Sequence, residues 1–248
     1  MTAFVRSHQF SFATLLLVAA LVAGACGGDA TNSLPSVSPT PVVEADYPRT
    51  VIDDAGASVT ITAKPQRIVA LTPASLEALD QFGLGQGVVG VAACTCLPIA
   101  FTAKPQVADY TGTNVEAIIS LNPDLVFVGG SGFTPDDAIT QLKAANLTVV
   151  TLDPKSISGV YTTLQLIGDA AGASVAAAEA VATAKSDIAV LTALVQDQPM
   201  VSVFYEIDAT GAIYGLAPDD YAAELVALAR GDLVSSGVNG VYEISLEA

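Results

Sequence analysis

Short apolar segments alternate with segments of helical spacing, and this alternation restricts the fold more than any other feature of the chain. The strand-like segments are residues 67–71, 88–91, 125–128 and 148–152, and the helical ones are residues 75–82, 115–121 and 136–145. Because the strand-like segments are apolar on both faces, they favour a parallel sheet covered by helices on both sides. Ligands of such sheets bind beyond the carboxyl ends of the strands. We therefore expect an α/β fold with its site at that edge.

The flanking segments predict a hairpin before the sheet and a long helix after it. Residues 50–62 alternate around an Asp-Ala-Gly turn, which is a hairpin signal. A helix is expected at residues 158–171, followed by an alanine-rich helix at residues 174–196 with a length of roughly 35 Å. Pro199 stops it, and the chain then predicts strands at 200–205 and 213–216 and a helix at 219–229. Two lobes joined by the long helix, or one α/β domain with that helix packed on its sheet, both fit this pattern.

The N-terminal segment predicts export from the cytoplasm. Residues 10–25 are almost wholly apolar, Arg6 is the only charged residue before them, and small residues precede Cys26. The apolar run is shorter than the roughly 20 residues of a spanning helix. The segment resembles a bacterial lipoprotein signal, which implies that Cys26 carries the lipid, and ordinary secretion with an unmodified Cys26 remains the alternative. Residues rich in Gly, Ser, Thr and Pro then predict a flexible tether.

Composition excludes several classes of function. The chain has 25 acidic and 9 basic residues, so it lacks the clustered Lys and Arg that bind nucleic acid. Its single histidine, His8, lies in the export signal, which argues against a histidine-based metal site, triad or general base in the mature chain. Cys94 and Cys96 do not complete a tetrahedral metal site. We expect Cys94 and Cys96 to lie in a loop beside the ligand-binding cleft rather than in a metal site. The sequence does not assign their redox state.

Two ordered motifs resemble the iron-siderophore and cobalamin substrate-binding proteins of ABC importers. The first comprises residues 67–79, 83–85 and 88–91, and the second comprises residues 110–126. The resemblance covers about residues 50–248. It implies a class III binding-protein fold, in which two α/β lobes with central parallel-rich sheets are joined by a long rigid helix and hold ligand between them. In this family the second lobe continues beyond the equivalent of Ala248, so we expect an incomplete second lobe.

These inferences give one proposed division of the chain and a set of partners. The division is a signal peptide at 1–25, a lipidated tether at 26–48, an N-terminal α/β lobe at 49–172, a connecting helix at 173–198 and a partial C-terminal lobe at 199–248. We expect a monomer without catalytic activity, anchored by lipid at the extracytoplasmic face of a bacterial membrane. Its partners would be a small metal chelate and an ABC permease. A surface thiol-redox enzyme using Cys94 and Cys96, or a structural lipoprotein, is the alternative function.

The candidate ligand residues follow strands or match the family pattern. Thr72 would face the ligand, and the alternative is an ordinary helix start in which Thr72 caps a helix that begins with Pro73; both roles can hold together. The candidates are Thr72, Pro73, Ala74, Tyr110, Thr111, Gly112, Phe133, Tyr205 and Tyr214.

The mature chain is poor in Arg and Lys, which favours a neutral or weakly charged ligand over an anionic ferric catecholate. A corrinoid gripped by aromatic rings is our first choice, a ferric hydroxamate the second and haem the third. The resemblance also implies that Glu77 and Glu224 dock arginines of the permease. Each glutamate could instead complement the positive end of its own helix.

Overall fold

The computed structural model describes residues 47–248 except 131, 211, 236–240 and 245–248. Its contacts divide the chain into two units, Met1–Pro41 and Val42–Ala248, and only the second contains described residues. The predicted signal, the lipidation site Cys26 and nearly all of the predicted tether lie outside the described residues. In the described part of the chain, no helix is both long enough and apolar enough to cross a membrane.

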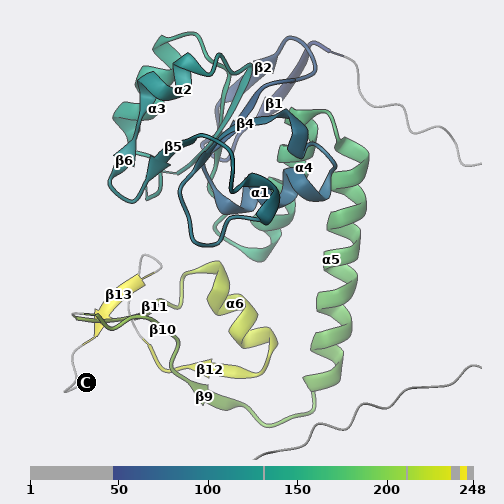
Figure 1. The fold of residues 1–248 in the computed structure, drawn as a ribbon. Coiled ribbons are helices and arrows are strands. Elements are labelled where there is room, and N and C mark those ends of the chain that lie inside the picture. The colour runs from purple at the N-terminus through teal and green to yellow at the C-terminus, as the bar shows by residue number, and fades with distance from the viewer. Residues whose placement is uncertain (1–46, 131, 211, 236–240, 245–248) are drawn as a thin grey trace, which may run out of the picture. The chain divides into compact units, whose positions relative to one another are not determined.

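The described chain begins with a hairpin, continues through alternating strands and helices, and then enters a long helix (Figure 1). The helices are α1 (Pro73–Gln81), α2 (Val115–Ser120), α3 (Asp136–Ala144), α4 (Ile157–Ala171), α5 (Ser174–Val195) and α6 (Tyr221–Leu228), with short 3-10 turns η1 (Gly85–Gly87) and η2 (Ile99–Phe101). The strands are β1 (Arg49–Ile52), β2 (Ser58–Ile61), β3 (Ile68–Ala70), β4 (Val88–Ala92), β5 (Gln106–Asp109), β6 (Gly112–Thr113), β7 (Leu125–Gly129), β8 (Val149–Leu152), β9 (Val201–Val203), β10 (Glu206–Asp208), β11 (Ile213–Leu216), β12 (Gly231–Leu233) and β13 (Val241–Ile244).

A six-stranded sheet with the order β6-β5-β4-β3-β7-β8 forms the centre of the first lobe. Neighbouring strands in the series β5-β4-β3-β7-β8 are parallel, and the short edge strand β6 is antiparallel to β5. The predicted parallel sheet is therefore confirmed. Because parallel strands share one direction, the turns after β3, β4, β5, β7 and β8 all leave the sheet at the same edge.

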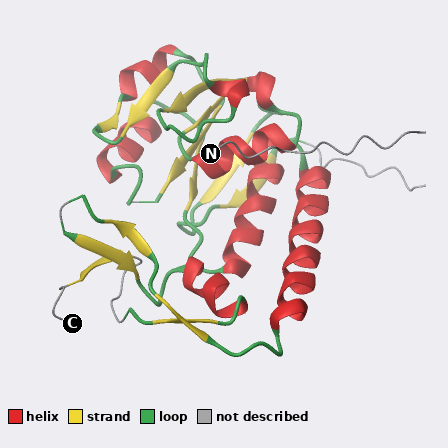
Figure 2. Ribbon diagram, turned by 60° about the horizontal axis from the view of Figure 1, so that its bottom comes forward, coloured by secondary structure: helices red, strands yellow, loops and turns green. Residues whose placement is uncertain are grey.

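Both faces of this sheet are buried by helices. In β3, Ile68 and Ala70 pack into one apolar cluster with α1 and α4, whereas Val69 packs into a second cluster with α2 and α3. In β7 the same alternation sends Phe127 to the first face and Val126 to the second. The period of two along each strand therefore explains why these strands are apolar throughout their length. Figure 2 shows the helices around the sheet.

The alanine-rich segment forms one unbroken helix, α5, of 22 residues, which corresponds to about 33 Å. Ala177 is fully buried in the cluster with α1 and α4, so the N-terminal half of α5 packs on the first lobe. Further along α5, Leu191 and Leu194 are 62% and 71% exposed and border an apolar groove shared with α6. Only one half of this helix is thus used to cover the first lobe.

Two small sheets follow α5. Strands β9 and β12 pair in parallel, and β10, β11 and β13 form an antiparallel sheet. The expectation of a parallel-rich sheet is therefore confirmed for the first lobe, whereas the described strands after α5 are mixed. Whether the second lobe is incomplete stays a prediction.

The turn of the β1–β2 hairpin is tied to the central sheet through two aspartates. Asp53 is 3% exposed, and its carboxylate accepts hydrogen bonds from the amides of Ala57 (2.7 Å) and Thr151 (3.2 Å). The carboxylate of Asp54 accepts from the amide of Asp153 (2.9 Å) and the hydroxyl of Thr163 (2.6 Å). These bonds connect the hairpin with β8, with the turn after β8 and with α4.

We predict that Asp53→Ala lowers the free energy of unfolding by about 2–4 kcal/mol, because the buried amide of Thr151 and the half-buried amide of Ala57 lose a charged acceptor. Urea unfolding followed by circular dichroism measures the change. Glu179→Ala, on the exposed side of α5, is the control and should change stability by less than about 0.5 kcal/mol. Equal stability of the two variants would contradict the role assigned to Asp53.

Candidate functional site

A hollow of about 560 Å³ lies at the carboxyl edge of the central sheet. Its lining comes from the residues at or just after the ends of four parallel strands. They include Leu71 and Pro73 after β3, Ala93 and Cys94 after β4, Asp109 to Gly112 at and after β5, and Gly132 to Pro135 after β7. A ligand-sized hollow at this edge is what the sheet topology predicts.

The β5–β6 turn carries one aromatic wall of this hollow. The carboxylate of Asp109 accepts hydrogen bonds from both the amide (2.7 Å) and the hydroxyl of Thr111. The hydroxyl bond, followed by the amide bond, lowers the pKa of Asp109 below its usual range because both stabilise the ionised form. The side chain of Tyr110, between these two residues, is 99% exposed. The turn therefore presents a tyrosine ring beside a carboxylate that remains ionised.

The turn after β7 carries the second aromatic wall, Phe133, which is 77% exposed. The amide of Phe133 donates to the carbonyl of Gly130 (2.8 Å), and the amide of Gly129 donates to the hydroxyl of Thr134 (3.1 Å). A Cβ atom at Gly129 would lie 2.5 Å from the Cβ atom of Phe133, so only glycine permits this tight turn. The glycines act by shaping the turn that holds the ring.

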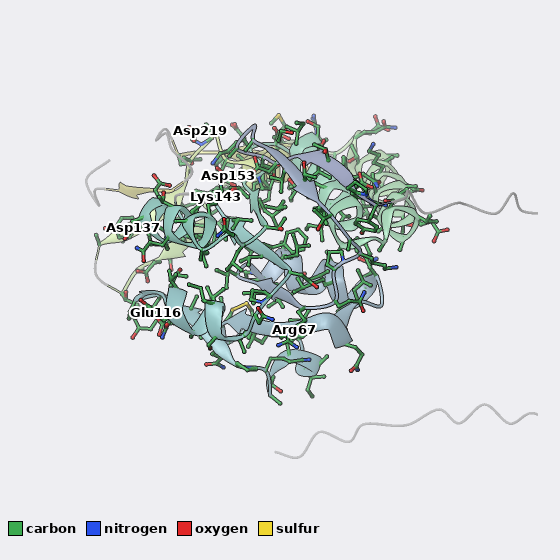
Figure 3. All side chains as sticks on the ribbon, turned by 90° about the horizontal axis from the view of Figure 1, so that it is seen from above. Arg67, Glu116, Asp137, Lys143, Asp153 and Asp219 are labelled. Carbon is green, nitrogen blue, oxygen red and sulfur yellow. A yellow bond between two sulfur atoms is a disulfide. The ribbon has the colours of Figure 1, made fainter. Side chains whose placement is uncertain are left out.

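Two further hollows adjoin the first through shared lining residues. One, of about 530 Å³, shares Asp109, Thr111 and Gly112 with it. The other, of about 390 Å³, shares Phe133 and is otherwise lined by Asp153, Pro154, Lys155, Asp219, Asp220 and Tyr221. Figure 3 labels Asp153 and Asp219 among all the side chains. The third hollow thus lies between the turn after β8 and the start of α6.

The structure brings five of the nine predicted ligand residues to the first hollow. They are Pro73, Tyr110, Thr111, Gly112 and Phe133. Of the other four, Ala74 is exposed on α1, Tyr205 follows β9, and Tyr214 lies in β11, and these residues do not line the three hollows.

Thr72, the fourth, is only 8% exposed and serves as the cap of α1. Its hydroxyl oxygen accepts from the amide of Ser75 (3.2 Å), and the two hydroxyl groups are hydrogen-bonded to each other. The helix-capping interpretation of Thr72 is thus confirmed, and its ligand role stays a prediction.

Sequence reasoning missed several lining residues, above all Asp109, Asp153, Asp219, Asp220 and Tyr221. Asp109 directly precedes the predicted Tyr110, and its spacing from Thr111 is typical of an Asp that closes a turn. That spacing was the available signal. The other four residues come from two segments, the turn after β8 and the start of α6, which are distant in sequence from Phe133, so their proximity to Phe133 depends on the fold.

The two glutamates predicted to dock a permease have different surroundings. Glu77 is exposed on α1. Glu224 is also exposed, but its carboxylate accepts a hydrogen bond from the amide of Ile157 (2.9 Å), the first residue of α4. Glu224 also lies in the first turn of α6. Its charge therefore interacts with the positive ends of two helices.

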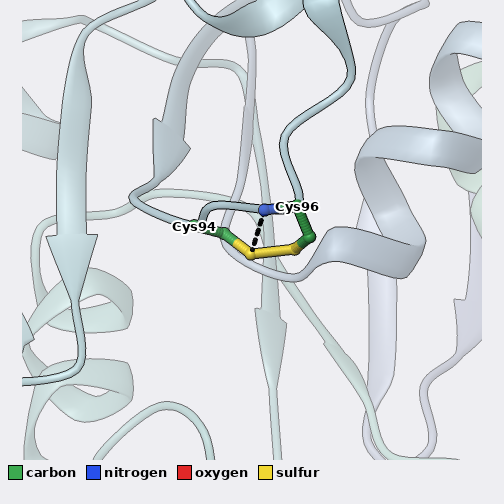
Figure 4. The surroundings of a disulfide bond; sticks show 2 residues. All are labelled: Cys94 and Cys96. Atoms are coloured by element: carbon green, nitrogen blue, oxygen red, sulfur yellow. Dashed lines mark hydrogen bonds between the residues drawn. A yellow bond between two sulfur atoms is a disulfide. The ribbon is translucent and has the colours of Figure 1, made fainter. Parts of the chain in front are cut away.

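Cys94 and Cys96 form a disulfide at the edge of the first hollow (Figure 4). The amide of Cys96 donates to the Sγ atom of Cys94 at 3.0 Å. The redox state that the sequence left open is thus the oxidised one. Among the described residues, His, Cys, Asp and Glu side chains form no group of three or more that could hold a metal ion.

The fold and this site define a two-lobed solute-binding protein with a long connecting helix. Residues 68–247 match the family model described as periplasmic binding protein. The chain is 33% identical over 242 residues to an ABC transporter substrate-binding lipoprotein of Bacillus subtilis, a match that covers 96% of this chain and 76% of that protein. The chain therefore belongs to the periplasmic binding protein family, whose members include substrate-binding proteins of ABC transporters.

Two further comparisons agree with this assignment. A cobalamin-binding protein of Halobacterium salinarum is 29% identical over 244 residues, and the match covers 94% of this chain and 63% of that relative. The chain thus spans less than two thirds of that relative's length. The crystal structure of a periplasmic vitamin B12-binding protein of Vibrio cholerae matches with a TM-score of 0.66 at 19% identity, covering 74% of this chain and 72% of the other. At this identity the likeness shows the fold.

We predict that Gly129→Ala destabilises the protein by about 1–3 kcal/mol, because the new methyl group would overlap the Cβ atom of Phe133. Gly132→Ala is the matched control in the same turn, where a Cβ atom would meet nothing within 4 Å. Thermal unfolding of both variants measures the difference. A Gly129→Ala variant as stable as Gly132→Ala would disprove the tight packing of this turn.

Proposed function

We propose that this protein is a lipid-anchored solute-binding protein that captures a metal chelate and delivers it to an ABC permease. The observation that carries the proposal is the hollow at the carboxyl edge, which is flanked by the exposed rings of Tyr110 and Phe133. Two exposed rings beside one hollow form an apolar surface, and exposed apolar patches often mark ligand-binding grooves. The family assignment favours solute binding over the thiol-redox and structural alternatives.

A corrinoid is the ligand class that we favour, with a ferric hydroxamate second. Both are bulky, and the three adjoining hollows offer room at several turns rather than one narrow pocket. The first two hollows contain no Arg or Lys among their described lining residues, which disfavours an anionic catecholate. The name of the Halobacterium relative supports the corrinoid. Haem remains third, since the described residues contain no histidine to ligate its iron.

Retention at the extracytoplasmic face of the membrane follows from the sequence of the N-terminal segment. Lipid on Cys26 and the Gly-, Ser-, Thr- and Pro-rich segment that follows it would keep a monomeric binding protein close to its permease. The name of the Bacillus relative, a substrate-binding lipoprotein, supports this anchor.

Ligand binding is tested by calorimetric titration of the purified protein with cyanocobalamin, a ferric trihydroxamate, a ferric catecholate and haem. We expect saturable binding of one of the first two chelates. Tyr110→Ala and Phe133→Ala should each weaken that binding by about tenfold, because each removes an exposed ring from the hollow.

Ile99→Ala is the control for these titrations, because Ile99 is 91% exposed and does not line the three hollows. Its affinity should equal that of the unaltered protein. If the unaltered protein binds none of the four chelates, the proposed function is wrong.

Docking on the permease is tested separately with Glu77→Arg. We expect unchanged chelate affinity but at least about tenfold slower chelate uptake by cells that carry the protein and its permease, because reversed charge repels an arginine of the permease. Glu116→Arg, at an exposed position in the first turn of α2, is the control. Normal uptake with Glu77→Arg would remove Glu77 from the docking surface.

A further inference from the structure

The charged side chains that line the three adjoining hollows are mainly acidic. Among the described residues that line the first and second hollows, Asp109 is the only charged side chain. The third contains Asp153, Asp219 and Asp220 with one cation, Lys155, whose Nζ atom lies 2.7 Å from a carboxylate oxygen of Asp153. The lining of these three hollows thus contains four carboxylates and one ammonium group.

We infer that Asp109 is a specificity-determining residue, which makes the site favour cationic and neutral chelates over anionic chelates of the same frame. This inference rests on the proposed function and narrows its substrate class. Asp109 occupies the border between the two larger hollows, so a chelate in either hollow lies close to its carboxylate. A ligand anion placed there is repelled, whereas a ligand cation is attracted.

The charge at Asp109 is held in place and held ionised. Asp109 is the last residue of β5, so its backbone is held by the sheet. Its carboxylate is oriented by hydrogen bonds from the amide and hydroxyl of Thr111. The same bonds keep its pKa low, so the charge persists when the solution is made mildly acidic. Protonation that removes the charge occurs only as the pH falls through this lowered pKa. The selectivity should therefore be constant from pH 7 down to about pH 5.

The size of the effect is set by solvent screening. Asp109 is exposed, so its interaction with a ligand charge several ångströms away is closer to the aqueous than to the buried limit. We expect a change of about three- to tenfold in affinity for each unit of ligand charge, decreasing as salt is added.

The test uses two pairs of chelates that share a metal-binding frame and differ in charge at one peripheral group. The first pair is a linear ferric trihydroxamate with a free terminal amine and its N-succinyl derivative, and the second is cyanocobalamin and its monocarboxylate derivative. Calorimetry at low salt gives the ratio of the two affinities within each pair. For the pair that binds, the unaltered protein should prefer the less negative chelate.

Asp109→Asn removes the charge but keeps an oxygen that can accept from Thr111, so the turn that carries Tyr110 is preserved. We expect this variant to lower the ratio of the less negative to the more negative chelate by about three- to tenfold for the cobalamin pair, whose members differ by one charge, and by roughly the square of that factor for the hydroxamate pair, whose members differ by two. The anionic chelate should bind more tightly, and the chelate with the free amine more weakly. A purely structural role of Asp109 would instead weaken both chelates equally. Asp187→Asn removes one acidic charge from the exposed face of α5 and should leave the ratio unchanged.

Each outcome separates the inference from the proposed function. An equal affinity ratio in the unaltered protein and in Asp109→Asn, with chelate binding retained, overturns the role of Asp109 and leaves chelate capture intact. Failure of the unaltered protein to bind any of these chelates overturns the proposed function, and the inference with it.

Discussion

The two-sided burial of the central strands is the constraint on which the rest of the structure depends. Ile68 and Val69, which are neighbours in β3, pack into opposite apolar clusters, and β7 repeats the same alternation. Because helices cover both faces, polar groups of the turns can gather only at the edges of the sheet. The parallel direction of the strands then collects the turns after β3, β4, β5 and β7 around one hollow.

Local hydrogen bonds convert that shared edge into a shaped site. Thr111 orients the carboxylate of Asp109, and the absence of a side chain at Gly129 allows the turn that holds Phe133. The hairpin supports the same edge from outside, since Asp54 accepts a hydrogen bond from the amide of Asp153 next to the third hollow. The two exposed rings are thus carried on turns that are fixed at several points, which limits the ordering cost when a ligand binds.

The region after α5 connects to the first lobe through specific groups. The carboxylate of Glu224 caps the first amide of α4, and Asp219 to Tyr221 complete the third hollow. Glu224 is also a proposed docking residue, so a permease arginine would compete with this capping bond for the same carboxylate. Glu77 is exposed on α1, so docking through its carboxylate would involve no such competition.

The sequence by itself determined the parallel α/β lobe, the unbroken helix α5 and the aromatic turns at Tyr110 and Phe133, because each depends on local periodicity or on turn chemistry. It did not reveal β5, β6, β10, β12 or β13, which are short and lack a pattern of their own. Only the tertiary structure decided that Thr72 caps α1, that Cys94 and Cys96 are paired, and that Asp109, Asp153 and Asp219 line adjoining hollows. The physical reason is that burial, pairing and convergence at a sheet edge are properties of segments distant in sequence, whereas periodicity reports only on neighbours.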